Sequence, residues 1–387
     1  MGKGKTCRKG SMLCILIIVF LSVLTLTGCW DYQGLGEQTL VGGIAVDQGE
    51  AGRGYRLTFE IVDLEGGEGG QFGSILLTTH GETLAEAVYD AYAKLHGRMH
   101  LGVADVLIVG QTLAEREGLL PLVRFLMQDQ TARNSLRIVV AGTDTAAELF
   151  APIEPEGEEN TGQDEAPNVL LSKILSESLS PRRQGARKAM DAPAVFEIYN
   201  ILTRRTSDLV LPIISPSDAA DIPFQLDGLA LFTGDRMTGT LPAADMFAYL
   251  LTTANLRDRA FPIEIDGQRA VLTVRSSRPQ VDYLLEDGTL RLTLNMQVTA
   301  ETLQLPDGWN GTDRAQMSRL EAEAEYQLST RVQKLIERLR DEGRDIFGFA
   351  ETIRNRDPRL WEQIAADWHT WLRMSTLEVC IEMSVKH

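Results

Sequence analysis

The first 28 residues constrain this chain most, because they have the pattern of a segment that is removed before the rest folds. A basic start is followed by an apolar run at residues 12–26. That run has the length of a signal-peptide core, whereas a permanent transmembrane helix needs roughly 20 apolar residues. We therefore predict that residues 1–28 are a cleaved signal peptide. The basic residues at its start are Lys3, Lys5, Arg8 and Lys9.

A cysteine stands at the end of this segment. Leu26, Thr27, Gly28 and Cys29 resemble the lipobox of bacterial lipoprotein precursors. Small residues before the cysteine let the backbone lie extended in a peptidase cleft, and the Cys29 thiol is the nucleophile that takes up diacylglycerol. We predict that Cys29 is lipidated and that its fatty acyl chains, typically palmitate, anchor the protein to the outer face of a membrane. The alternative is a chance cysteine after an ordinary signal peptide.

The remaining chain is acidic. Cleavage removes four basic residues, so the net charge of −16 becomes 34 − 54 = −20. A pI near 4.9 gives no basic footprint for nucleic acid. Anionic headgroups repel such a surface, so the acyl chains must provide the attachment to the membrane. Cys380 is the one thiol left after cleavage and lipidation, so we expect no internal disulfide.

Hydrophobic periodicity predicts helices and strands in mixed order. Thr83 and Glu86 form a capping box at the start of one helix, and Thr112 and Glu115 predict a second box that opens a helix to about residue 128, bent at Pro121. This order favours an α/β or α+β unit. Strands are expected at residues 39–46, 55–62, 103–109, 136–141, 226–232, 237–241, 270–275, 290–299 and 377–385, and a long helix at 314–342.

Three segments together resemble the Ger(x)C family of spore germination lipoproteins. The first comprises residues 27–31 and 40–47, and the second runs from Thr83 to Gly110. The third is the most specific, because Asp-Ile-Phe-Gly-Phe at 345–349 before a Trp-bearing helix rarely arises by chance. One departure follows Cys29: residues 32–37 replace the basic residues and Glu-Leu that family members commonly carry.

The resemblance implies a fold and a setting. It implies a mixed α/β (α+β) protein of three compact domains with separate small sheets, on the outer face of the spore inner membrane. It also implies assembly with two integral membrane subunits, of A and B types, in a nutrient germinant receptor. Whether this subunit binds the germinant stays open. We divide the chain into a signal peptide at 1–28, an N-terminal region at 29–205 with an acidic excursion at 151–168, and a C-terminal domain at 222–387.

The third segment has two interpretations. Phe347 and Phe349 around Gly348 predict a packing and helix-start motif, and the alternative is a surface that docks a partner. Trp361 and Trp368 share a helix face, which is more often core than interface.

No sequence motif nominates catalysis, a cofactor or a metal site, so we expect a protein that is not an enzyme. His96 and His100 have the spacing of two metal ligands, but Gly97 lies between them in an expected bend. The main alternative is a solute-binding lipoprotein of an uptake system, which would need two similar lobes. A membrane-tethered hydrolase is a further alternative, disfavoured because no nucleophile motif is present.

Overall fold

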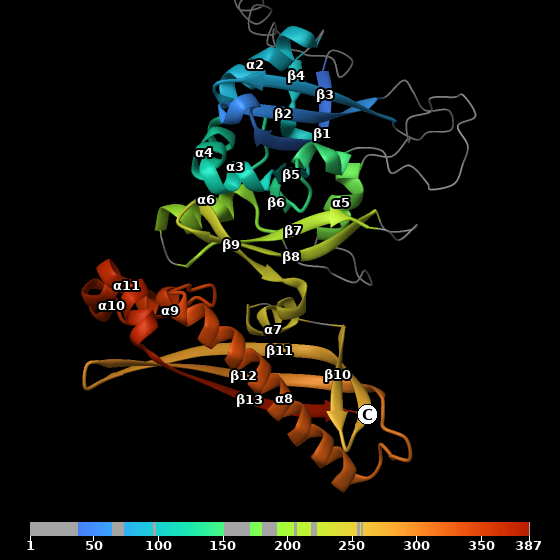
Figure 1. Ribbon diagram of the computed structural model, residues 1–387, viewed down its shortest axis with the longest axis vertical. Coiled ribbons are helices and arrows are strands. Elements are labelled where there is room, and N and C mark those ends of the chain that lie inside the picture. The colour runs from blue at the N-terminus through green and yellow to red at the C-terminus, as the bar shows by residue number, and fades with distance from the viewer. Residues whose placement is uncertain are drawn as a thin grey trace, which may run out of the picture.

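The computed structural model describes residues 38–63, 73–95, 98–150, 171–179, 192–204, 207–217, 223–253, 256 and 258–386. Within them, two separate sheets follow one another along the long axis of the molecule, each covered by helices (Figure 1). The predicted mixed α+β fold with separate sheets is confirmed. Cys29 and the acidic excursion lie outside the described residues.

The first sheet is mixed. Its strand order is β3-β2-β1-β5-β6-β7-β8-β9, with the short β4 beside β1. The central strands β1, β5, β6 and β7 are parallel, and the outer strands are antiparallel to their neighbours. The strands are β1 Gln38–Gln48, β2 Tyr55–Asp63, β3 Gly73–Gly81, β4 Arg98–His100, β5 Val106–Val109, β6 Arg137–Ala141, β7 Val210–Pro216, β8 Phe224–Thr233 and β9 Arg236–Pro242.

Helices cover both faces of this sheet. In β5, Leu107 and Val109 join the core on one face, and Val106 and Ile108 join the core on the other, because side chains alternate along a strand. A strand such as β5, buried on both faces, is therefore apolar throughout. On the first face lie α2 Leu84–Lys94, α3 Gln111–Arg116, α4 Leu120–Gln128 and α6 Val195–Arg204, and on the second lie the 3₁₀ helix η4 Ala146–Phe150 and α5 Leu171–Leu179.

The capping boxes had different outcomes. The box at α2 is confirmed: the Glu86 amide donates to Thr83 Oγ1 at 3.2 Å, and the Thr83 amide donates to Glu86 Oε2 at 3.3 Å. The predicted box at Thr112 is wrong, since α3 begins after Gly110 without a side-chain cap. The single helix to residue 128 is also wrong. Gly118 adopts φ 78° and breaks it, and Pro121 lies in the first turn of α4, where a missing N–H is tolerated.

The second sheet has the order β10-β11-β12-β13. Three strands are antiparallel, and the C-terminal β13 returns parallel to β12. The long α8 crosses this sheet (Figure 1) and buries the predicted apolar stripe that includes Leu328 and Ile336. The elements are α7 Ala243–Thr253, β10 Arg259–Ile265, β11 Gln268–Glu286, β12 Thr289–Gln304, α8 Arg314–Asp341, α9 Phe349–Arg356, α10 Pro358–Ile364, α11 Trp368–Met374 and β13 Thr376–Lys386.

The first sheet continues past residue 222, because β8 and β9 pair with β7. The division into 29–205 and 222–387 stays a prediction. Among the residues that the structure describes, no helix is long and apolar enough to cross a membrane.

Truncating the stripe of α8 tests the packing of the second sheet. Leu328→Ala should lower the free energy of unfolding by about 2–5 kcal/mol, because the side chain is 3 % exposed and leaves a cavity. Tyr326→Ala on the same helix is the matched control, since Tyr326 is 68 % exposed and its loss should change stability by less than about 0.5 kcal/mol. Urea unfolding of both variants is the measurement. Equal effects would contradict the packing of α8.

Candidate functional site

The molecule has two halves: the first contains the first sheet and ends with β9, and the second begins with α7 and contains the second sheet. The segment at residues 343–354 of the second half contacts the first half. Arg344 Nη1 donates to Thr238 Oγ1 on β9 at 2.8 Å, and Arg354 Nη1 donates to the carbonyl of Arg204 at the end of α6 at 3.3 Å. Both acceptors belong to the first half, whereas both arginines precede or lie on α9. The family-like motif is therefore the joint between the halves.

A reciprocal backbone contact lies at the centre of this joint. The Asp208 amide donates to the Asp345 carbonyl at 2.9 Å, and the Asp345 amide donates to Asp208 Oδ2 at 2.8 Å. The Asp345 carboxylate also accepts from the amides of Gly348 at 3.0 Å, Phe349 at 3.0 Å and Ala350 at 2.7 Å. These bonds satisfy the amides that begin α9. One buried side chain thus starts a helix while its backbone holds the other half.

Burial raises the pKa of both the Asp345 and the Asp208 carboxyl. Burial raises the pKa of Asp345 to about 6, against the opposing effect of the three amides that favour its charged form. The neighbouring Asp208 charge raises this pKa further. Burial also raises the pKa of Asp208, although the amide of Asp345 and the charges of His369 and Arg344 oppose the shift. The joint therefore contains two carboxyls that burial drives toward the protonated form.

Aromatic side chains surround the joint. The Phe347 ring lies 6.0 Å from Phe349 and 6.5 Å from Tyr249 on α7. Phe349 and Trp368 are buried, and Trp361 lies 5.7 Å from Trp368. The predictions of a packing and helix-start motif and of a core position for Trp368 are confirmed. The shared helix face predicted for Trp361 and Trp368 is wrong, because Trp361 lies on α10 and Trp368 begins α11.

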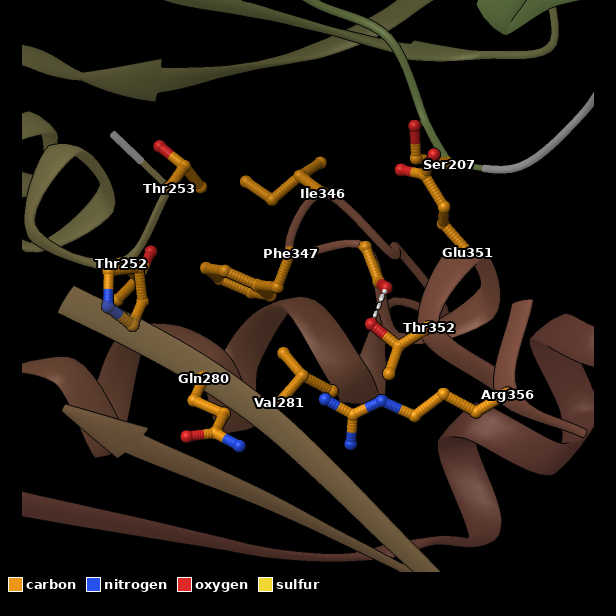
Figure 2. Close-up of a pocket in the computed structure, with 12 residues that line it drawn as sticks. Ser207, Thr252, Thr253, Gln280, Val281, Ile346, Phe347, Glu351, Thr352 and Arg356 are labelled. Carbon is orange, nitrogen blue, oxygen red and sulfur yellow. Dashed lines mark hydrogen bonds between the residues drawn. The ribbon is translucent and has the colours of Figure 1, made fainter. Parts of the chain in front are cut away.

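A cleft of about 440 Å³ opens beside the motif. Its walls come from the loop before β7, the end of α7, the middle of β11 and the start of α9. Figure 2 shows Phe347 reaching toward Thr252 of α7, and Arg356 extending from α9 beneath Val281. Arg356 Nη1 donates to Asp282 Oδ1 at 2.8 Å, and Thr352 Oγ1 donates to the Gly348 carbonyl at 3.0 Å. The cleft is a polar surface with hydrogen-bonding groups, which suits a binding role.

The residues considered for chemistry do not come together. His96 lies outside the described residues, His100 lies in β4, and His369 Nδ1 contacts the Gly343 carbonyl at 2.7 Å. In the described part of the chain, no three His, Cys, Asp or Glu side chains are grouped to hold a metal ion. The exposed Cys380 thiol lies on β13, and partial desolvation and the Glu378 charge raise its pKa, which disfavours the thiolate.

Comparison with known families covers nearly the whole described chain. A model described as the spore germination protein N-terminal domain matches residues 31–216, and one described as spore germination B3/GerAC like, C-terminal, matches residues 227–387. These two matches define the class of the chain as a spore germination protein. The chain belongs to the Ger(x)C family, the C subunits of germinant receptors, as its sequence motifs predicted.

Individual relatives agree with this assignment. The chain is 21 % identical to spore germination protein KC of Bacillus subtilis (strain 168), over 92 % of this chain and 90 % of that protein. It is 22 % identical to spore germination protein GerQC of Bacillus cereus, over 90 % of this chain and 93 % of that protein. The crystal structure of the GerBC protein has the same fold, with a TM-score of 0.56 and 15 % identity over 89 % of this chain and 97 % of that one.

The buried carboxyl of Asp345 gives stability a specific pH dependence. Because its pKa rises from 3.8 to about 6 on folding, the native state holds a proton that the unfolded chain has lost. The stabilisation of the folded state by this proton is fully present below pH 3.8 and disappears as the pH rises through about 6. The loss amounts to about 3 kcal/mol, and Asp208 acts in the same direction.

Urea unfolding at several pH values between 4 and 7 measures the slope of the free energy of unfolding against pH. Asp345→Asn should flatten it, because the amide does not titrate. The matched control is Asp307→Asn, which removes an exposed carboxyl from a turn and should leave the slope parallel to that of the wild type. An unchanged slope in Asp345→Asn would show that the joint carboxyl does not titrate with folding.

Proposed function

We propose that this protein is a lipid-anchored, non-enzymatic C subunit of a nutrient germinant receptor, needed for spore germination through assembly with two integral membrane subunits of A and B types. The observation that carries the proposal is the extent of the family match. It begins at residue 31, two residues after the lipobox-like Cys29, and ends at residue 387. A lipid anchor at Cys29 would therefore adjoin the family domains directly.

The distance from Cys29 to the fold limits where the protein can sit. β1 begins at Gln38, nine positions after Cys29. Nine residues reach at most about 30 Å even when fully extended. An acyl chain on Cys29 therefore holds the first sheet next to the outer leaflet of the spore inner membrane. Confinement of this kind raises the effective concentration beside membrane subunits, so modest interfaces suffice for assembly.

The roles of the buried carboxylates support a non-enzymatic protein. Asp47 accepts from the amides of Ala146 at 2.7 Å and Ala147 at 3.2 Å. Glu60 accepts from the amides of Leu171 at 2.7 Å and Ser172 at 3.0 Å. Together with Asp345, these side chains satisfy backbone donors that would otherwise be buried without partners. Their chemistry is structural.

The solute-binding alternative is less well supported. It requires two similar lobes around a hinge, whereas the described chain has one mixed sheet and one four-stranded sheet of different topology. The two relatives named above are spore germination proteins.

Affinity purification of the full-length protein from detergent-solubilised spore membranes tests the assembly. Mass spectrometry should identify two polytopic membrane proteins in the wild-type sample and a diacylglycerol-modified Cys29 at the mature N-terminus. Cys29→Ala should abolish the modification and the co-purification, because the anchor is lost.

Cys380→Ala is the matched control, since it removes the exposed thiol of β13 and leaves the anchor intact. It should keep both membrane proteins. Recovery of transporter permease and ATPase subunits with the wild type, or of no membrane protein, would refute the receptor-subunit proposal. Co-purification that persists in Cys29→Ala would refute the role of the anchor alone.

A further inference from the structure

A second hollow lies in the first sheet, away from the joint. This crevice of about 270 Å³ sits at the carboxyl ends of β1, β5 and β6. Gln48 ends β1, Thr112 follows β5, and Asp144 follows β6, and all three residues line it. Three parallel strands of the sheet thus contribute to one site.

The crevice lies where the chain leaves the sheet in opposite directions. The connection after β5 leads to α3 on one face, and the connection after β6 leads to η4 on the other, as their separate cores show. In open α/β sheets, diverging connections leave a crevice outside the carboxyl ends of the strands, and ligands bind there. This placement favours a binding role for the crevice.

Two buried polar atoms of the crevice residues have no hydrogen-bond partner. They are Gln48 Oε1, an acceptor, and Arg56 Nε, a donor. Both atoms are enclosed by protein in this conformation. Because buried polar atoms in proteins are nearly always paired, the Gln48 and Arg56 side chains gain a partner when they turn toward the crevice that they line. The amide of Gln48 is otherwise engaged, because Nε2 donates to the Gly54 carbonyl at 3.2 Å.

Some charged side chains around the crevice have partners within the described chain, and others do not. Asp47 accepts two backbone amides and lies 3.4 Å from Arg56 Nη2, so its charge is compensated. Within the described part of the chain, Arg116 and Asp144 make no hydrogen bond or ion pair, and both are exposed at the rim. A Cβ on Gly52 would lie 3.2 Å from Arg116 Nη1, so glycine keeps this wall open beside the guanidinium.

We propose that this crevice binds a small polar molecule that carries one carboxylate or phosphate group. Arg116 contacts the oxyanion from the rim, and Arg56 turns toward it, because a guanidinium matches carboxylate and phosphate geometry. Asp144 accepts hydrogen bonds from hydroxyl or amine groups elsewhere on the molecule, and Gln48 Oε1 does so once its side chain turns toward the crevice. The volume corresponds to about nine water molecules, so the ligand is a small metabolite. This binding is independent of the lipid anchor and of receptor assembly.

Ligand-observed NMR titration of the full-length protein in detergent tests the proposal. The probes are glycolate and glycerol 3-phosphate, with glycerol as the probe that lacks an anion. Sodium chloride keeps the ionic strength constant, because exposed charges are screened. We expect saturable binding of glycolate if the site takes carboxylates, of glycerol 3-phosphate if it takes phosphates, and of glycerol in neither case.

Arg116→Gln should weaken this binding at least about tenfold, because it removes a charge-assisted contact from an exposed position. The matched control is Arg124→Gln, which removes an exposed arginine from α4 outside the crevice and should leave affinity unchanged. Three results would overturn the proposal: no saturable binding of either anion, equal binding of glycerol, or equal weakening by both variants.

Discussion

The contact between Asp208 and Asp345 is the point at which the two halves of the molecule hold each other through polar groups. Each backbone amide donates to the other residue, and the Asp345 side chain begins α9 at the same time. Asp345 therefore holds the first half through its backbone and begins α9 through its side chain. A buried carboxyl is costly unless it is hydrogen-bonded, and here three amides offset part of that cost. The aromatic residues Phe347 and Phe349 then exclude water from the contact.

Buried carboxylates of the first sheet also accept the first amides of helical segments. Asp47 on β1 holds the start of η4, and Glu60 on β2 holds the start of α5. In each case a buried carboxylate in an early strand accepts amides from a segment about a hundred positions later in the chain. Such bonds place helices against the sheet more specifically than apolar contact does, because donor geometry is directional. They also give these buried acidic residues a structural role.

Much of the fold followed from local patterns. The stripe of α8, the capping box of α2 and the alternation in β13 were all predictable, because each depends on residues close together in sequence. The box at Thr112 failed because α3 begins after Gly110, and the single helix failed because Gly118 in a left-handed conformation and Pro121 favour two short helices over one. The joint motif was recognised from its residues, but its contact with Asp208 was not, since 137 positions separate the two aspartates.

The sequence by itself determined the family, the mixed α+β class and the expectation of a lipid anchor at Cys29. These conclusions depend on spacing and residue type along the chain, which a linear reading contains. Only the tertiary structure decided which half the joint motif touches, which carboxyls are buried, and that Gln48, Arg56 and Arg116 line one crevice. The reason is physical: desolvation and hydrogen-bond satisfaction depend on what lies within a few ångströms, and strand pairing sets that distance.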